Sequence, residues 1–450
     1  MKDEHEFLDN LMQVCNSAKR EERFAAVAHA STIIRSTQGL IPIGREVNNH
    51  VHTTYSFSPY EPAAAVCAAR KAALAVVGSV DHESIGAAEE LLDASKAFGL
   101  VGTVGFEVRA SFADSPFFDR KINNPDSRGI AYMCVHGIPR NKLPEAEAFL
   151  LPLRKARFER NTQQVERLNQ LLSKADVDTI DFQGDIVRRS RWDEKGTITE
   201  RHILAALVEK LVQSCGDRNS LLSLLRDRFS VKVDPKQESL VLDSANPFFL
   251  YDMLGLLKSQ FLDRFFIQPT AEETPDVRAV ADIARSIGAI AAYAYLGDVK
   301  TSVTGDKKPE NFEDAFLDQL IAFIAEIGIP AVTYMPPRNT ISQIRRVQQL
   351  CQKHDLMQIS GVDINSPRQS FGCPQLLQKD SAHLIDSAWA LAAHERLSDQ
   401  DAAWGLFHHD NPYRGLPLDQ RIALYARWAR QCNPFEIESI CVLAQRSLKK

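Results

Sequence analysis

The sequence predicts an α/β fold in which strand–helix units build a barrel of parallel strands, with a helical insertion and helical segments at both ends. Short apolar runs alternate with alanine-rich helical stretches from about residue 47, and this alternation resumes after residue 265. Between them, residues 141–265 carry long amphipathic helical patterns. The predicted segments are an N-terminal extension (1–40), two parts of the barrel (41–140 and 266–375), the insertion (141–265) and a C-terminal cap (376–450).

The extension and the first part of the barrel can be followed element by element. Residues 5–37 carry apolar side chains at helical spacing, which predicts helices that pack on the main domain. EPAAAVCAARKAA is a predicted helix with Pro62 in its first turn, and ALAVVGSV is a predicted buried strand. The next helix, SIGAAEELLDASKAFG, ends at Gly99, and LVGTVGFEV is the following strand.

The insertion and the later segments follow the same logic. LPLRKARFERNTQQVERLNQLL and TITERHILAALVEKLV have the spacing of long amphipathic helices. Three helix-then-strand units come next, in PDVRAVADIARSIGAIAAYAYL, FEDAFLDQLIAFIAEIGIPAVTYM and ISQIRRVQQLCQKHDLMQISGVDIN. HLIDSAWALAAHERL and DQRIALYARWARQC predict a helical cap. The insertion either covers a pocket and selects a small nucleotide or forms an oligomer interface, and the sequence allows both.

Composition limits the classes of partner and location. With 53 Lys and Arg against 58 Asp and Glu, the net charge of −5 gives no global field that would hold an extended nucleic acid. The N-terminus lacks the basic-then-apolar order of a signal peptide, and no apolar run approaches the ~18 residues of a membrane span. The eight scattered cysteines form no CxxC pair, which favours reduced thiols. We therefore expect a cytoplasmic protein without a membrane segment.

Four apolar runs end on residues of the kinds that bind metal ions. The carboxyl ends of parallel barrel strands open onto one face, so such residues are expected to meet in one pocket. The runs EVNNHVH, AVVGSVDH, GTVGFE and MQISGVD supply His50, His52, Asp81, His82, Glu107 and Asp363.

The His50-x-His52 spacing places both imidazoles on the same side of a strand, because strand side chains alternate with period two. Two histidines with carboxylates suit zinc, iron or manganese better than calcium or magnesium, which prefer oxygen ligands. A histidine pair alone is a weak signal, because such pairs are more often ordinary surface or core residues. The convergence of four strand ends is what favours a metal site here.

These motifs, taken in order, resemble those of the PHP family (polymerase and histidinol phosphatase). HVHTTYS, the DH pair at 81–82, the Glu of GFEVRA and the Asp of GVDINSP carry the resemblance, which covers about residues 45–140 and 275–370. It implies a distorted seven-stranded (β/α) barrel that holds up to three metal ions and hydrolyses phosphate esters. The inserted helices look most like the branch of nucleotide phosphatases and 5′-to-3′ exoribonucleases.

The resemblance also implies a ligand set. One ion would be held by His50, His52, Glu107 and Asp363, a second would need His136, and only His82 remains of the third set. One or two divalent ions per chain are therefore expected, as zinc, manganese or iron. The sequence departs from the family at four ligand positions, where it has Ser56-Phe57-Ser58, Tyr132, Tyr293 or Tyr295, and Asn365.

The leading functional hypothesis is hydrolysis of a phosphomonoester or nucleotide by a metal-activated water. Asp81 and His82 are candidates to orient that water or exchange its proton. With few metal ions, cationic side chains must stabilise the transition state, and the candidates for this and for substrate binding are Arg109, Arg368, Arg201 and His202. The alternative is a catalytically impaired protein that binds a phosphorylated ligand or a partner, with a structural metal ion.

Several of these residues also have ordinary interpretations. His136 fits a ligand or a satisfied core histidine, and Arg109 fits the pocket or a salt bridge on the solvent side. The segment WGLFHHDNPYRGLP, residues 404–417, contains His408, His409 and Asp410 and has the composition of a surface turn, with a lid as the alternative.

Overall fold

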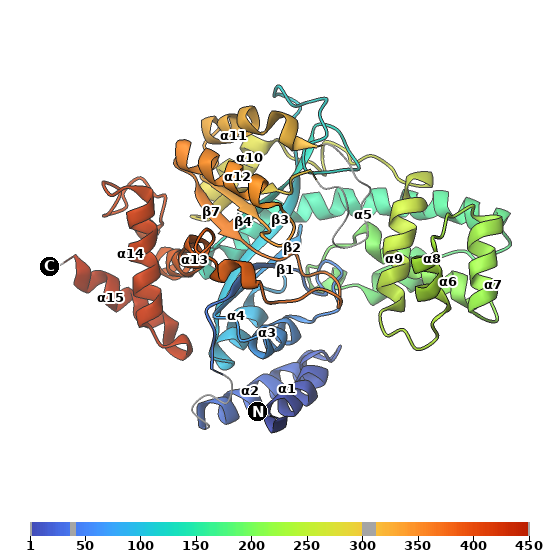
Figure 1. Ribbon diagram of the computed structural model, residues 1–450, viewed down its shortest axis with the longest axis horizontal. Helices are drawn as coiled ribbons and strands as arrows, with labels where there is room; N and C mark the ends of the chain where they lie inside the picture. Colours follow the sequence, from blue (N-terminus) through green and yellow to red (C-terminus); the bar gives the residue numbers. More distant parts are fainter. Residues whose placement is uncertain (1, 37–41, 299–311, 449–450) are drawn as a thin grey trace.

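The computed structural model describes residues 2–36, 42–298 and 312–448, with side chains from residue 6 onward. Residues 1, 37–41, 299–311 and 449–450, which belong to the predicted segments, lie outside this range. The described residues form one seven-stranded sheet in the order β1 to β7, which curls into a nearly closed barrel (Figure 1). The strands are β1 (Val47–Val51), β2 (Val76–His82), β3 (Val101–Ser111), β4 (Ile130–His136), β5 (Ile290–Tyr295), β6 (Ala331–Tyr334) and β7 (Met357–Ser360).

The predicted α/β barrel of seven strands is confirmed, but the expectation that its strands are parallel is wrong at one strand. β4 runs antiparallel to both β3 and β5, whereas the other neighbouring pairs in the sheet order are parallel. The carboxyl end of β4 therefore points to the opposite end of the barrel. His136, which ends β4, pairs with Gly105, two residues before Glu107 on β3.

The barrel closes at a seam between β1 and the residues that follow β7. His52 N donates to Ile364 O at 3.0 Å, and two amide side chains extend the seam. Asn48 Nδ2 donates to Val362 O and Asn49 Nδ2 donates to Ser360 O, each at 3.0 Å. The backbones approach so closely that a Cβ on Gly361 would lie 2.4 Å from the Cβ of His50, so only glycine fits there.

Helices cover the outside of the barrel, as the alternating pattern predicts. They are α3 (Pro62–Lys71), α4 (Ala88–Ala97), α10 (Val277–Ser286), α11 (Leu317–Glu326) and α12 (Ile341–Lys353). Gly99 follows α4 with φ = 67°, the left-handed conformation expected of a helix-ending glycine. Thr340 and Gln343 form a capping box at the start of α12.

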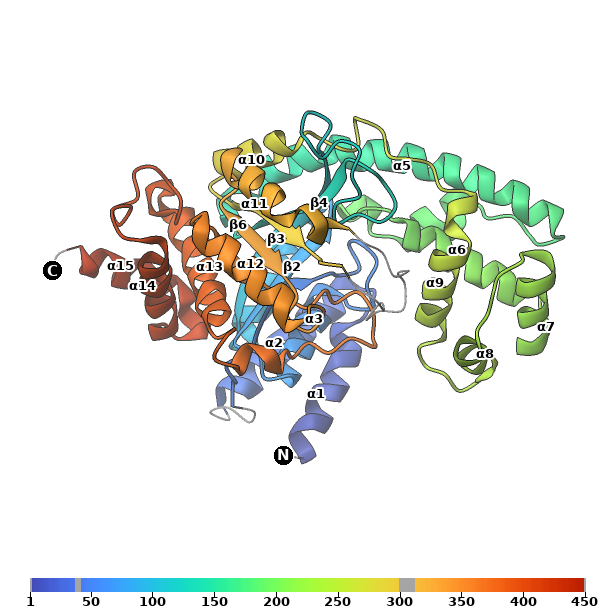
Figure 2. The same ribbon diagram turned by 45° about the horizontal axis from the view of Figure 1, so that its top comes forward.

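The insertion forms a helical lobe beside the barrel, and Figure 2 shows the long helix α5 running from one to the other. The helices are α5 (Leu143–Lys174), α6 (Glu200–Gln213), α7 (Arg218–Ser223), α8 (Pro235–Leu242) and α9 (Phe249–Gln260). Residues 165–265 build their own hydrophobic cluster, while the start of α5 belongs to the core of the barrel. α5 therefore connects two cores.

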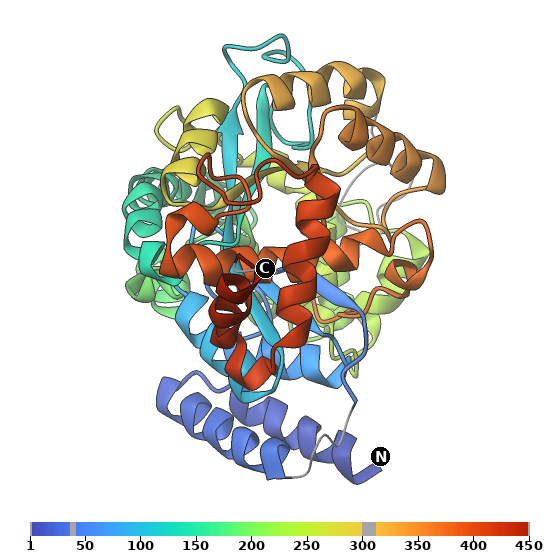
Figure 3. The ribbon, with the colours of Figure 1, turned by 90° about the vertical axis from the view of Figure 1, so that its left-hand side faces the viewer.

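Helices at both ends of the chain pack on the barrel. At the N-terminus, α1 (Lys2–Cys15) and α2 (Arg20–Ser36) lie against α3 and α4, and Leu8, Leu11 and Ala30 are buried. At the C-terminus, α13 (His383–Gln400) packs across the amino ends of the strands, with α14 (Leu418–Gln431) and α15 (Ile440–Ser447) outside it (Figure 3). Among the described residues, no helix is both long enough and apolar enough to span a bilayer.

The contact between α13 and the barrel contains a buried carboxyl group. Glu395 is 1% exposed, and its Oε2 accepts a hydrogen bond of 2.8 Å from Val104 N. Burial raises the pKa of Glu395 from 4.5 to about 7, although Arg396 opposes the shift. Between these two values the folded protein binds a proton that the unfolded chain lacks, so this group makes stability fall as pH rises, by at most about 3 kcal/mol.

We therefore expect Glu395→Gln to reduce the pH dependence of stability. Glutamine keeps an acceptor for Val104 N but does not ionise, so the variant should be more stable than wild type at pH 8 and close to it at pH 5. Urea unfolding at pH 5, 6, 7 and 8 measures this difference. The exposed Glu436→Gln is the matched control, and equal pH profiles for all three proteins would contradict the assignment.

Candidate metal centre

Four ligand-type side chains come together near the carboxyl ends of β1 and β7 and beside the second half of β3. His50 lies on β1 and His52 follows it, Glu107 lies on β3, and Asp363 follows β7. His50 Nε2 is 3.8 Å from Glu107 Oε1, His52 Nε2 is 4.0 Å from Glu107 Oε2, and His52 Nε2 is 3.4 Å from Asp363 Oδ1. An ion with bonds of about 2.0–2.2 Å in a tetrahedral site separates its ligand atoms by about 3.3–3.6 Å. His50, His52 and Glu107 offer ligand atoms within 4.8 Å of one another and fit one divalent ion, whereas Asp363 adjoins this group through His52.

Electrostatics in this cluster favour the protonation states that metal ligands need. Burial lowers the pKa of His52 to about 3, and the nearby His82 adds to this effect. Burial alone would raise the pKa of Glu107, but the imidazoles of His82, His50 and His52 lower it well below its ordinary value. Near neutral pH the cluster thus presents a neutral His52 and an ionised Glu107.

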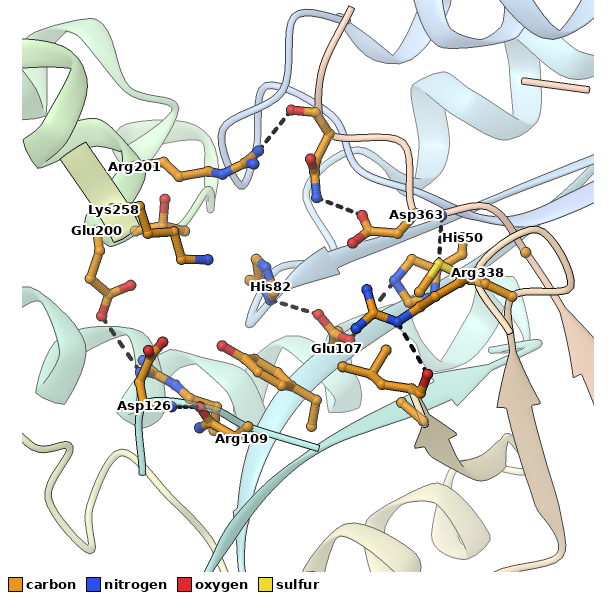
Figure 4. Close-up of a pocket in the computed structure, with 18 of the residues that line it drawn as sticks. His50, His82, Glu107, Arg109, Asp126, Glu200, Arg201, Lys258, Arg338 and Asp363 are labelled. Carbon is orange, nitrogen blue, oxygen red and sulfur yellow. Dashed lines mark hydrogen bonds and ion pairs between the residues drawn. The ribbon is translucent and has the colours of Figure 1, made fainter. Parts of the chain in front are cut away.

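His82, at the end of β2, lies beside this cluster and faces the pocket. Its Nδ1 is 2.9 Å from Glu107 Oε2, and its ring lies 4.6 Å from that of His52. The side chain is 23% exposed and lines the cavity (Figure 4). His82 is therefore placed to exchange protons with a bound molecule or to contribute to a second ion.

His136, at the end of the antiparallel strand β4, lies close enough to the cluster to interact electrostatically with His50. Its side chain is buried, and its Nε2 has no hydrogen-bond partner among the described residues, which is rare for a buried nitrogen. Burial, assisted by His50, lowers its pKa to about 3. His136 lies outside the group of mutually close ligand atoms formed by His50, His52 and Glu107.

Asp81 is not in the pocket, because its carboxylate is held by Thr53 and Ser56 in the loop that follows β1. It is 2% exposed, and both of its carboxylate oxygens accept hydrogen bonds from Thr53 and Ser56. It is absent from the residues that line the cavity, so the structure does not place it to orient a water there.

The cavity in front of the cluster has a volume of about 180 Å³ and is walled by both the barrel and the insertion. Arg201 of α6 and Lys258 of α9 come from the insertion, and Arg338 comes from the loop after β6 (Figure 4). Arg201 Nη1 donates to Asn365 O at 2.7 Å, which joins the insertion to the seam. The insertion thus contributes side chains to the pocket.

Two of these cations were not found from the sequence. Arg338 lies in the loop after β6 and is not a metal-ligand residue type, so the search of strand ends for ligands passed over it. Lys258 sits on a helix of the insertion and carries no sequence signal of its own.

Arg109 lines the cavity but belongs to a buried ionic network. Three arginines and three glutamates from β3, α5, α6 and two loops pair with one another: Arg109, Arg157, Arg160, Glu83, Glu200 and Glu273. Arg109 donates to Glu273, and its Nη1 lies 3.5 Å from Glu200 Oε1. Its charge is therefore largely compensated before any substrate arrives.

Arg368 and His202 do not line the cavity. Arg368 makes a two-bond ion pair with Asp252 at 2.7 Å and is 43% exposed. His202 caps α6, where its Nδ1 accepts a hydrogen bond of 3.0 Å from Thr199 N, and its ring packs on Phe57. Burial lowers the pKa of His202 to about 3. The structure thus places neither residue to contact a molecule in the pocket.

A second group with metal-ligand chemistry lies on the surface segment 404–417. His408, His409 and Asp410 follow one another in a turn, and both His409 and Asp410 are exposed. His409 Nε2 pairs with Asp410 Oδ2 at 3.0 Å. This group is far more solvated than the buried cluster, so the two are chemically distinct.

Comparisons with known proteins give limited similarity. No family model matches the chain, and no curated protein matches it. Among solved structures, the chain is similar to a suspected metal-dependent phosphoesterase from Bifidobacterium adolescentis, at 20% identity and a TM-score of 0.49, over 77% of this chain and 97% of that one. It is also similar to an amidohydrolase from Chromobacterium violaceum with bound sulfate and no metal, at 17% identity and a TM-score of 0.48, over 73% and 90%.

Proposed function

We propose that this protein is a metal-dependent hydrolase that cleaves a phosphate ester, either a phosphomonoester or a nucleotide. The observation that carries the proposal is the convergence of His50, His52, Glu107 and Asp363, with neighbouring ligand atoms 3.4–4.0 Å apart, at the edge of a cavity. The ordered motifs of the chain, which resemble those of the PHP family, support a phosphate ester as the substrate class.

The proposed chemistry divides between an ion and the chain. A divalent ion bound by this set lowers the pKa of a coordinated water to about 7 and offsets phosphate charge. His82 lies 2.9 Å from Glu107 and faces the cavity, so it is placed to take or return a proton. Arg201, Lys258 and Arg338 line the cavity and favour an anionic ligand.

The pocket also supports a small substrate. Leu204, Leu262 and Phe266 add apolar surface on the side of the insertion, which suits an organic group next to a phosphate. The limited cavity volume of about 180 Å³ and the net charge of −5 both argue against an extended nucleic acid.

Phosphate release by metal-stripped and reconstituted protein tests the proposal. Samples treated with a chelator and then loaded with manganese, zinc or iron are assayed on a panel of phosphomonoesters and nucleotides. Wild type is expected to turn over at least one of them, and Glu107→Gln is expected to lower kcat/KM by ~10³-fold or more, since it removes a charged ligand beside the reacting group. The exposed Glu89→Gln serves as the control, and equal rates for all three proteins would contradict the proposal.

One observation favours a second candidate, a binding protein with a structural ion. One of the two β5 tyrosines, Tyr293 or Tyr295, stands where the family has a metal ligand, and both are engaged elsewhere: Tyr293 donates to Glu313, and Tyr295 Oη donates to Asp314 at 2.6 Å. A second ion therefore lacks ligands from β5. In the same assays this candidate predicts bound metal and ligand-induced thermal stabilisation without turnover.

A further inference from the structure

A series of hydrogen bonds that the proposed reaction does not use links Asp81 to the candidate metal ligand His52. It starts at the buried carboxylate of Asp81 on β2 and ends at the ring of His52. Ser56 Oγ donates to Asp81 Oδ1 at 2.6 Å, and the same Oγ lies 3.2 Å from His52 Nδ1. The opposite ring nitrogen, Nε2, faces Asp363 and Glu107.

The direction of the protons in this series of hydrogen bonds is fixed by its donors. Thr53 N, which can only donate, donates to Asp81 Oδ1 at 2.6 Å. Thr53 Oγ1 accepts from Tyr55 N at 3.2 Å and donates its own proton to Asp81 Oδ2 at 2.6 Å. Burial raises the pKa of Asp81, but these bonds from Ser56 and Thr53 act in the opposite direction. The carboxylate therefore serves as an acceptor for all three groups.

Ser56 has a single hydroxyl proton, and it is given to Asp81. Its oxygen can then only accept a hydrogen bond from His52, which requires a proton on Nδ1. A neutral imidazole with its proton on Nδ1 has a bare lone pair on Nε2, and that lone pair is what binds a metal ion.

We infer that Asp81 is a positioning residue that acts through the hydroxyl group of Ser56 to keep the proton of His52 on Nδ1 and so leaves Nε2 ready to bind a metal ion. The inference rests on the proposed metal site but not on the identity of the substrate. It gives Asp81 a role beside the metal centre without any contact to the reacting atoms.

Three single substitutions in and beside this series of hydrogen bonds test the inference. Ser56→Ala removes the link to His52 while Thr53 still satisfies Asp81. Asp81→Asn keeps an acceptor for Ser56, because Thr53 N forces the amide oxygen to the Oδ1 position, but it removes the charge that strengthens the bond. Ser58→Ala is the control, since Ser58 is buried in the same loop and its Oγ has no hydrogen-bond partner among the described residues.

The first readout is the tautomer of His52, taken from imidazole nitrogen chemical shifts of metal-free protein labelled at histidine. The second is zinc affinity by competition with a chelator. We expect Nδ1–H in wild type and Ser58→Ala, a shift toward Nε2–H with ~10- to 100-fold weaker zinc binding in Ser56→Ala, and an intermediate effect in Asp81→Asn.

Two results would overturn the inference: an Nε2–H tautomer in the wild type, or an unchanged tautomer in Ser56→Ala. Near-UV circular dichroism checks that each variant is folded, and the tautomer is read out independently of affinity. Because neither measurement uses a substrate, the inference and the proposed phosphoesterase activity can fail separately.

Discussion

Glu273→Gln is expected to lower the free energy of unfolding by about 3–5 kcal/mol, the cost of breaking a buried ion pair by removing one partner. Glu273 is 0% exposed and lies before α10. Its carboxylate accepts from Arg109 on β3 and from Arg160 on α5, where the bonds from Arg160 are 2.6 and 2.9 Å long.

The expected loss is large because the change leaves charge without compensation. The network contains three arginines and three glutamates, so its charges cancel, and removing one carboxylate leaves an excess positive charge in a buried place. The complete network need not make the protein more stable than packed apolar residues would in the same place. Breaking it in part is nevertheless costly.

Urea unfolding followed by circular dichroism measures this effect, as a shift of the midpoint at constant slope. Glu272→Gln is the matched control, because Glu272 is the exposed neighbour of Glu273 and its replacement should change stability by no more than about 0.5 kcal/mol. Indistinguishable midpoints for the two variants would show that the network contributes little to the fold.

The double variant His50→Ala/His52→Ala is expected to lose bound metal, with affinity lower by about 10³-fold or more. Four-ligand zinc sites bind with apparent free energies of about 10–16 kcal/mol, or about 3 kcal/mol for each ligand. Removing two ligands therefore costs about 6 kcal/mol of binding free energy. Because each step of about 1.4 kcal/mol corresponds to a tenfold change in affinity, this exceeds the factor of about 10³ that we expect. Metal content after gel filtration, measured by mass spectrometry, reports the loss.

The surface group supplies a matched control for that measurement. His408→Ala/His409→Ala also removes two neighbouring histidines beside a carboxylate, but from an exposed turn. This variant should keep the tightly bound ion. The assignment of the ion to the buried cluster would be wrong if His408→Ala/His409→Ala lost the metal and His50→Ala/His52→Ala kept it.

Much of the fold could be predicted because its signals are local. Helical and strand periodicities identify α3, β2, α4 and β3 in order, and Gly99 takes the left-handed conformation that its position predicts. The His50-x-His52 spacing likewise specifies a shared side of one strand.

The direction of β4 could not be predicted in this way. The apolar run that forms it looks the same whether the strand runs up or down, since period-two alternation has no direction. Direction depends on the path of the chain, and the link from β3 to β4, residues 112–129, contains no helix, so the chain returns antiparallel to β3 instead of crossing over. His136 still ends its strand, but because β4 is reversed, that strand end points to the opposite end of the barrel.

The side-chain partners of Arg109 and Asp81 also could not be predicted from the sequence. Both lie next to ligand-type residues along the chain, which made a role in the pocket the simplest hypothesis. Their partners come from elsewhere: Glu200 and Glu273 lie about a hundred or more positions from Arg109, and Ser56 reaches Asp81 from the loop after β1. Proximity in sequence identified the neighbourhood of each residue but not the direction of its side chain.

The seam between β1 and β7 gives the proposed ion a mechanical meaning. His50 and His52 stand on one side of this joint and Asp363 on the other, and part of the joint is held by the side-chain amides of Asn48 and Asn49. A cation shared across it would act as a clasp, so ion binding and barrel closure would be coupled thermodynamically. The ion that activates the water would then also hold β1 and the segment after β7 together.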